Sequence, residues 1–115
     1  MRIALALILA LAATPTFAAT GQSLFNDQCS GCHTLGPAST PDAPTLKGVV
    51  GRKVASLPDF QYSAGLKAKG GTWTEAALGA FLADPQTYAP GTYMYAQVQD
   101  PTERQAIVDY LKTAK

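Results

Sequence analysis

The stretch Cys29-Ser30-Gly31-Cys32-His33 holds the only two cysteines and the only histidine of the 115-residue chain. Two thiols and one imidazole in this order suit four kinds of site: a disulfide beside a bystander histidine, a redox dithiol, part of a metal site, or a covalent haem anchor. Each kind needs different surroundings. The rest of the sequence therefore has to decide among them.

Three of these interpretations fit the remaining sequence less well. A simple disulfide is common in exported chains, and it stays open as an alternative. A thioredoxin-like dithiol needs a strand leading into it within an alternating pattern of strands and helices, and the sequence shows no such pattern. A zinc site would have only Cys29, Cys32 and His33 as ligands, and two adjacent residues do not easily turn their side chains onto one ion.

The pattern Cys-x-x-Cys-His in an exported chain is typical of c-type haem attachment. Two thiols one turn apart match the separation of the two haem vinyl groups, so Cys29 and Cys32 are predicted to form the thioether bonds of one haem c. His33, held by the neighbouring thioether, then presents its imidazole to the iron as an axial ligand. We therefore expect one covalently bound haem.

Residues 1–18 are predicted to be a cleaved secretory signal. Arg2 precedes an apolar run over residues 3–13, and that run is about half the length a bilayer needs. An uncleaved anchor is the alternative. Residues 19–115 would then form one small monohaem domain in the periplasm, near the lower size limit for a single apolar core.

The charge balance argues against two classes of partner. The chain has nine Lys and Arg against eight Asp and Glu, a net charge of +1, and loss of Arg2 with the signal makes the domain formally neutral. A neutral domain without a basic patch has no footprint for nucleic acid or for an anionic membrane surface. We therefore expect no nucleic-acid partner and no stable membrane insertion.

Apolar spacing predicts helices in the first and middle parts of the chain. The first is expected over residues 20–32, where apolar side chains and both cysteines recur at helical spacing. The second is expected over residues 74–83. Thr72 and Glu75 have capping-box spacing at its start, and Pro85 ends it.

The last of three main helices is the best marked. Asp100 can cap it, and Pro101 suits its first turn. Residues 35–71, by contrast, are rich in Gly and Pro and predict loop, with about one turn of helix over residues 63–67. An all-α chain with such long loops favours a large bound group around which the loops wrap.

The second axial ligand follows by elimination. The chain has no second histidine, and Met94 is the only thioether left once the signal is removed. It lies in the turn-forming stretch Pro90-Gly91-Thr92-Tyr93-Met94, which can carry a side chain over the far face of a haem. Ordinary core packing is the alternative for Met94. With both axial positions filled, the iron can pass one electron and has no open site for substrate.

The order of several motifs makes the chain resemble class I c-type cytochromes, close to mitochondrial cytochrome c and its bacterial photosynthetic relatives. The resemblance covers nearly all of the domain and implies the small all-α cytochrome c fold, with long loops around one haem. The motifs that follow the haem-binding stretch are Pro44-Thr-Leu46, Gly51-Arg-Lys53, Phe60-Gln-Tyr62, Gly71-Thr-Trp73, Tyr88-Ala-Pro-Gly-Thr-Tyr-Met94, Thr102-Glu-Arg104 and Tyr110-Leu111.

The resemblance also implies roles around the haem. The Pro44 carbonyl would accept a hydrogen bond from His33 and so orient its ring. Arg52, Tyr62 and Trp73 would hydrogen-bond a haem propionate, although Arg52 could be a surface cation and the two aromatics plain core. The residues expected to line the haem or brace the Met94 loop are Leu46, Phe60, Phe81, Leu82 and Thr92. The residues expected where the first and last helices cross are Gly21, Phe25, Ile107 and Tyr110.

The haem edge departs from the family, because the lysines that surround it in mitochondrial proteins are largely missing. The residues found at those positions are Gln28, Gln86, Thr87 and Tyr93. Docking to redox partners is therefore expected to rest on apolar and aromatic contacts, with weak electrostatic steering. The residues expected to provide these contacts are Tyr88, Tyr93, Tyr95 and Ala96.

A second departure lies beside the methionine ligand. Leu66 and Phe81 occupy positions where the family usually has Asn and Tyr. A polar network near the sulfur is thereby lost. We expect this to dry the pocket and to tune the reduction potential.

The function implied is that of a periplasmic one-electron carrier of a respiratory or photosynthetic chain, a monomer and not an enzyme. Its expected donors are a membrane quinol-oxidising complex or a periplasmic dehydrogenase, and its acceptors a terminal oxidase or a reaction centre. One alternative is a dedicated haem c subunit of a periplasmic dehydrogenase or oxidase complex. Another is a peroxidase or gas sensor, which needs an open iron site.

Overall fold

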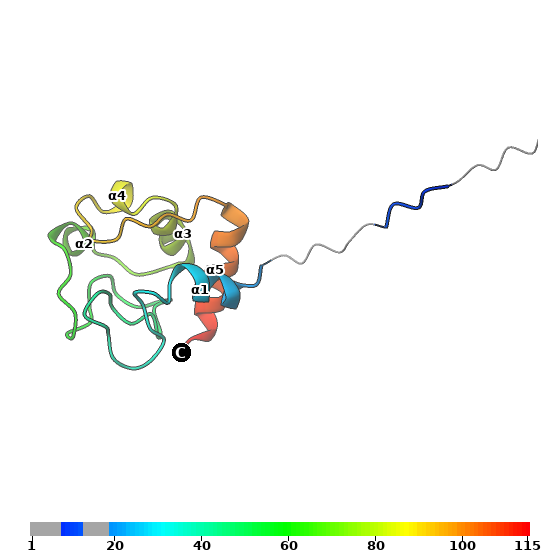
Figure 1. The fold of residues 1–115 in the computed structure, drawn as a ribbon. Helices are drawn as coiled ribbons and strands as arrows, with labels where there is room; N and C mark the ends of the chain where they lie inside the picture. Colours follow the sequence, from blue (N-terminus) through cyan, green and yellow to red (C-terminus); the bar gives the residue numbers. More distant parts are fainter. Residues whose placement is uncertain (1–7, 13–18) are drawn as a thin grey trace, which may run out of the picture.

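The fold is built from short helices joined by long loops (Figure 1), which confirms the all-α prediction. The computed structural model describes residues 8–12 and 19–115. Within these ranges there is no strand, only an isolated bridge between Lys53 and Thr72, and no helix is long and apolar enough to cross a membrane. The predicted signal lies largely outside the described residues. The helices are α1 (Gly21–Gln28), α2 (Ala64–Lys69), α3 (Glu75–Ala83), α4 (Pro85–Tyr88) and α5 (Pro101–Thr113).

Helices α1 and α5, from opposite ends of the domain, cross each other (Figure 1). Gly21 lies directly against the backbone of α5 at Ala106. The Phe25 ring packs on Tyr110 with ring centroids 5.7 Å apart, and Ile107 is completely buried beneath them. The residues implied by the family resemblance therefore do meet at this crossing.

Helix α1 is shorter than its apolar spacing predicts, because it ends at Gln28 and not at residue 32. The backbone N–H groups of Cys29 and Ser30 both donate to the Phe25 carbonyl, which closes the helix. The hydroxyl of Ser30 also donates to the Asn26 carbonyl. Backbone carbonyls left over at a helix end need such partners. The cysteine motif therefore lies in turns just beyond the helix.

The middle helices differ from prediction in two places. Thr74, and not Thr72, caps α3, and its hydroxyl accepts from the Ala77 N–H at 3.1 Å. Pro85 ends α3 as predicted, but it also begins α4, which the sequence analysis missed. The Asp84 carboxylate caps this helix by accepting from the Thr87 N–H at 3.2 Å. Proline suits both positions, because it cannot extend a helix yet fits a first turn.

The predicted cap of α5 is confirmed, and α2 forms near the predicted turn of helix. Asp100 caps α5 by accepting from the Thr102 N–H at 2.8 Å, with Pro101 in the first turn. Ser63 caps α2 in the same way, accepting from the Leu66 N–H at 3.2 Å. Helix α2 begins one residue later and ends two residues later than the predicted range 63–67. Local capping chemistry thus sets these helix starts.

The long loops are held by backbone hydrogen bonds that bring distant segments together. The Leu46 N–H donates to the Thr34 carbonyl at 2.9 Å and closes the loop after the cysteine motif. Two further bonds of 2.8 Å join Gly51 to Trp73 and Trp73 to Arg52. This bridging places the Arg52 and Trp73 side chains at one wall of the molecule's central cavity.

Candidate functional site

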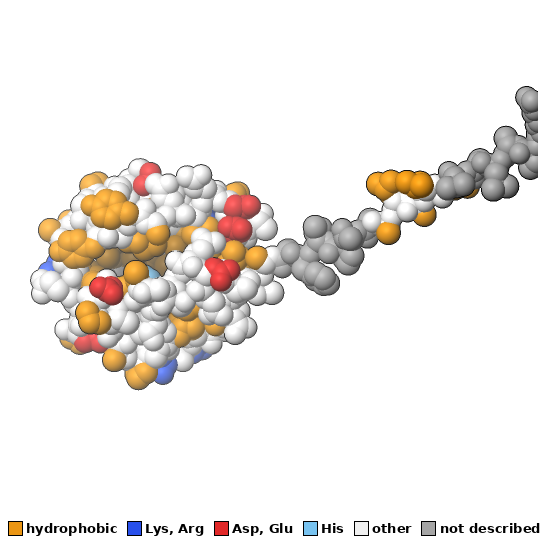
Figure 2. Space-filling view, in the orientation of Figure 1, with side chains coloured by type: hydrophobic (Ala, Val, Ile, Leu, Met, Phe, Trp, Pro, Cys, Tyr) orange, Lys and Arg blue, Asp and Glu red, His pale blue; other side chains and the backbone are white. Residues whose placement is uncertain are grey.

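A cavity of about 280 Å³ opens on one face of the domain. Figure 2 shows this hollow, with mostly apolar walls and the histidine inside it. Every residue predicted to bind the haem lines it. The predicted residues that line the cavity are Cys29, Cys32, His33, Pro44, Leu46, Arg52, Phe60, Tyr62, Trp73, Phe81, Leu82, Thr92 and Met94.

His33 is positioned by the turn that follows α1 and by the loop that carries Pro44. Its backbone N–H donates to the Cys29 carbonyl at 2.9 Å, and its ring Nδ1 lies 2.8 Å from the Pro44 carbonyl oxygen. A carbonyl can only accept, so Nδ1 carries the proton and Nε2 keeps its lone pair. Burial lowers the pKa of His33, against the opposing effect of the Pro44 bond, and the charge of Arg52 lowers it further. A neutral imidazole with a free Nε2 is the form that binds a metal.

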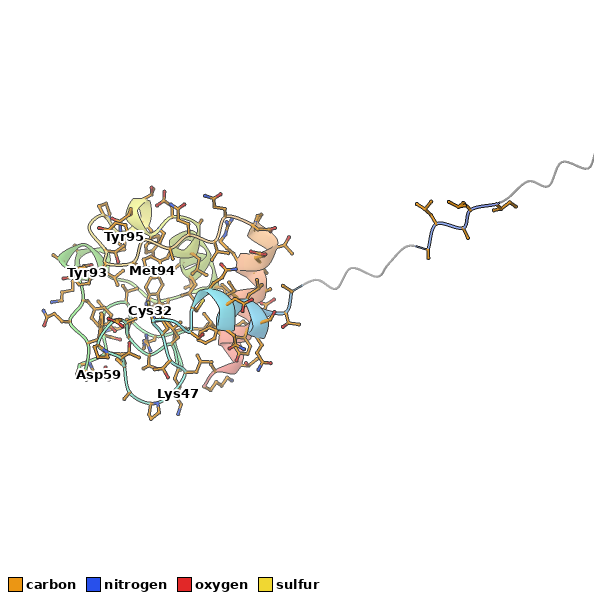
Figure 3. The ribbon with its side chains drawn as sticks, viewed as in Figure 1. Cys32, Lys47, Asp59, Tyr93, Met94 and Tyr95 are labelled. Carbon is orange, nitrogen blue, oxygen red and sulfur yellow. The ribbon has the colours of Figure 1, made fainter. Side chains whose placement is uncertain are left out.

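Cys29 and Cys32 lie one turn apart on the wall of the same cavity, and both are free thiols. Cys29 is half-buried, and burial raises the pKa of its thiol. Cys32 is exposed at the opening (Figure 3). A raised pKa is the opposite of what an activated redox cysteine needs. Within the described residues no group of three or more His, Cys, Asp and Glu side chains could hold a metal ion.

Met94 reaches the cavity from the loop after α4 (Figure 3). Thr92 is buried, and its N–H donates to the Ala89 carbonyl at 3.0 Å, which forms a turn before the methionine. Gly91 has a φ of 85°, a conformation that suits glycine. Gly65 of α2 packs directly under the Pro90 carbonyl, where a side chain would collide.

The side chain of Gln86 also holds this loop, and the sequence analysis missed it. Its amide nitrogen donates to the carbonyls of Thr92 and Met94, at 2.7 and 3.1 Å. Its amide oxygen accepts from the Gly91 N–H at 3.3 Å. The sequence offered only the absence of a lysine at this position. No pattern in the sequence indicates that a glutamine on a four-residue helix turns inward.

Arg52 is the strongest sign that an acidic group belongs in the cavity. Its Nε is buried and has no hydrogen-bond partner among the described residues, while its Nη1 donates to the Lys47 carbonyl at 3.2 Å. Burial lowers the pKa of this guanidinium. A buried charged donor without a partner is costly, so its presence fits a carboxylate of a bound group.

Two aromatic side chains flank the same wall as Arg52. The Tyr62 hydroxyl accepts from the Leu57 N–H at 3.3 Å, which leaves its own hydrogen available to donate. For the indole N–H of Trp73, the described residues provide no partner. Both side chains are buried. Arg52, Tyr62 and Trp73, each with a hydrogen-bond donor, thus all line the largely apolar cavity.

The remaining walls are apolar and aromatic. Phe60 packs edge-on against Tyr62 at 5.1 Å between ring centroids, and Phe81 lies 5.1 Å from Trp73. Leu66 and Phe81, the two departures beside the methionine, both face the cavity. The apolar lining residues that the sequence did not indicate are Ala43, Val49, Leu78, Ile107 and Leu111. Ala43 and Val49 lie in loops without a periodic pattern, and helical spacing does not distinguish a core face from a cavity face at the other three positions.

The tyrosines predicted at the rim of the cavity differ in their exposure. Tyr93 and Tyr95 are exposed at 63% and 77% and flank Met94 on the loop that borders the opening (Figure 3). Tyr88 is half-buried. Its ring stacks on Trp73 at 5.9 Å, with the Lys69 ammonium 4.5 Å from its centroid. Tyr88 therefore has a packing role that the sequence did not indicate, and its part in docking stays a prediction.

The donor set fits a haem c. Two thiols one turn apart can hold two vinyl groups, and a neutral imidazole and a thioether on the walls of one cavity can serve as axial ligands. The polar end with Arg52 suits the propionates, and the apolar walls suit the macrocycle.

Known proteins support the same assignment. The cytochrome c family profile matches residues 18–115. The chain is 42% identical to cytochrome c of Tetrahymena pyriformis over 97 residues, which cover 84% of this chain and 87% of that protein. It is 38% identical to cytochrome c2 of Rhodomicrobium vannielii over 95 residues, 81% of this chain and 75% of that one.

A solved structure agrees with the sequence relatives. Cytochrome cH from Methylobacterium extorquens superposes with a TM-score of 0.74 at 39% identity, over 81% of this chain and 94% of that one. The matches span nearly the whole described domain and include the cysteine motif. The chain therefore belongs to the cytochrome c family, the class I c-type cytochromes, which carry electrons on one covalently attached haem c.

Proposed function

We propose that this chain is a periplasmic one-electron carrier with His33 and Met94 as the axial ligands of its iron. The observation that carries the proposal is the placing of both side chains, with Cys29 and Cys32, on the walls of one apolar cavity. When bound, haem c supplies a one-electron iron centre. Cys29 and Cys32 would hold it through thioethers, and His33 would present Nε2.

The protein's own contribution is to orient the ligands and to exclude water. The Pro44 carbonyl fixes the tautomer of His33, as the outer partners of metal ligands commonly do. Arg52, Tyr62 and Trp73 would pair with the propionates. Leu46, Phe60, Phe81 and Leu82, which line the cavity, would keep the macrocycle dry.

Export supports a periplasmic location. Arg2 followed by a short apolar run is the pattern of a secretory signal. We propose that residues 1–18 are removed and that residues 19–115 form the mature carrier.

The proposed partners are redox proteins. The carrier would be a monomer and would bind them at the exposed rim of the cavity. A membrane quinol-oxidising complex or a periplasmic dehydrogenase would supply the electron, and a terminal oxidase or reaction centre would take it. Cys32, Tyr93, Tyr95 and Ala96 border the opening and would contact the partner. These side chains are uncharged, so steering by charge would be weak.

The exposed tyrosines also favour a second candidate, a dedicated haem c subunit of a periplasmic enzyme complex. Tyr93 and Tyr95 expose large aromatic surface side by side, and tyrosine is enriched at stable interfaces. Size-exclusion chromatography of the protein from its source separates the two. A free carrier elutes alone, whereas a subunit co-elutes with its enzyme.

Optical spectra of the holoprotein test the proposed ligation. We expect the spectrum of haem c, and in the oxidised form the absorption band that arises from a sulfur-to-iron bond. The Met94→Ala variant should lose that band and gain carbon monoxide binding in the reduced form, while the wild type binds none. A wild type that binds carbon monoxide readily would refute Met94 as a ligand and support a sensor or peroxidase.

A further inference from the structure

We propose that Gln86 is a positioning residue that fastens the Met94 loop and so keeps the methionine on the iron. The inference rests on the proposed function, because it takes Met94 to be the ligand. The resemblance leads one to expect a docking lysine at this position. The inference instead gives the uncharged Gln86 side chain a role inside the molecule.

The geometry of Gln86 matches the loop group for group. Its amide has two donors and an acceptor. The donors reach the carbonyls of Thr92 and Met94, at 2.7 and 3.1 Å, and the acceptor reaches the Gly91 N–H at 3.3 Å. One side chain thus bonds to the backbone of Gly91, Thr92 and Met94.

The base from which Gln86 reaches is fixed. It is the second residue of α4, whose first residue, Pro85, is among the most deeply buried side chains. Asp84 caps the helix through the Thr87 N–H and hydroxyl, at 3.2 and 2.8 Å. A helix of only four residues is stable here because it is buried and capped. Gln86 therefore holds the loop from a rigid support.

The loop has few other restraints near the methionine. Thr92 donates to the Ala89 carbonyl at 3.0 Å, and the next backbone-to-backbone bond along the chain joins Val98 to Leu82 at 2.8 Å. Among the described residues no backbone-to-backbone bond is made by residues 93–97. Tyr93 and Tyr95 beside the methionine are exposed. The bond from Gln86 to the Met94 carbonyl is thus the one that restrains the ligand residue.

Substitutions at Gln86 can separate the effects of its donor and acceptor bonds. Gln86→Glu keeps the size but loses both donors and sets a carboxylate against two carbonyls. Gln86→Lys keeps a donor but loses the acceptor for the Gly91 N–H. Gln86→Ala removes all three bonds. Gln28→Ala is the matched control, because Gln28 is exposed on α1 and its side chain bonds to no described residue.

The experiment measures how easily imidazole displaces Met94 in the oxidised holoprotein, followed by loss of the sulfur-to-iron absorption band. The loss of all three hydrogen bonds predicts an imidazole affinity raised at least about tenfold in Gln86→Ala. Gln86→Glu should show a larger rise and Gln86→Lys a smaller one. Gln28→Ala should stay within about twofold of wild type. A Gln86→Ala variant within twofold of wild type, or a control that rises equally, overturns the inference.

A second measurement separates local loosening from general loss of stability. Amide hydrogen exchange at Gly91 should quicken in Gln86→Ala, while exchange in α5 stays unchanged. Equal quickening in both places would show a global effect and refute the positioning role. A wild type without the sulfur-to-iron band refutes the proposed ligation and, with it, this inference. A wild type with the band and an inert Gln86 refutes the inference alone.

Discussion

Replacement of Gly21 by alanine tests the crossing of α1 and α5, on which the whole domain depends. A methyl group built at Gly21 would lie 2.8 Å from the Cβ of Tyr110 and closer still to the carbonyl oxygen of Ala106. Both neighbours belong to the middle of α5, where the helix cannot yield at one residue. The two helices therefore have to move apart.

The steric cost of the added methyl group opposes the gain in helix propensity from glycine to alanine. Alanine in a helix is favoured over glycine by about 0.5–1 kcal/mol. Forcing an extra methyl into a packed contact costs about 1–3 kcal/mol, and occasionally more. The oxygen of Ala106 belongs to the backbone, which puts this site at the upper end of that range. We expect Gly21→Ala to lower the free energy of unfolding by about 2 kcal/mol.

Guanidinium unfolding of the holoprotein, followed by the fluorescence of Trp73, measures the change. The matched control is Gly79→Ala in α3, where an added methyl meets nothing within 4 Å. The control should gain about 0.5–1 kcal/mol from helix propensity alone. The slope against denaturant should be unchanged in both variants. A Gly21→Ala variant as stable as the wild type would refute the close crossing.

Three further predictions concern the cavity and its rim. Arg52→Met should lower the reduction potential, measured by spectroelectrochemistry, because it removes a positive charge that disfavours the oxidised iron; Arg52→Lys should restore most of it, and no change would place Arg52 on the surface. Ser39 donates twice to Asp59, at 2.8 Å each, and these bonds hold the pKa of Asp59 below its usual value. That stabilisation is present above about pH 4 and is lost as pH falls through the lowered pKa, so acid unfolding curves of wild type and Asp59→Asn should converge at low pH; a difference constant across pH would contradict this. Tyr95→Ser should slow electron transfer to the partner, whose rate in the wild type should change by less than about twofold across physiological ionic strength; a steep fall with salt would show docking by charge.

The features that the sequence predicts well are those encoded within a few residues. Asp100 with Pro101 is a capping signal that acts over one turn, and it marks the start of α5 in the structure. The cysteine motif is local in the same sense, because its chemistry needs only its own spacing. The Pro44 contact with His33 came from the family pattern and is present at 2.8 Å.

The features that it misses depend on contacts between distant segments. The apolar spacing of α1 continues through Cys32, but the Phe25 carbonyl takes two N–H donors and the helix ends. The stacking of Tyr88 on Trp73 joins residues far apart in the sequence, and no local pattern predicts it. Gln86 is unremarkable in the sequence because the groups it bonds are backbone atoms, whose positions no residue type reveals.

The most exposed aromatic side chains lie beside the proposed ligand. Among the described residues these are Tyr93 and Tyr95, the two neighbours of Met94, whereas Tyr88 is half-buried and stacks on Trp73. A partner that presses on this surface therefore presses on the residues that carry the proposed ligand. A loop free to move would then change the iron's surroundings at each encounter, and electron transfer is fast only when geometry changes little. The hydrogen bonds of Gln86 to the Met94 loop therefore matter most in a carrier whose docking surface and iron ligand lie on one short segment.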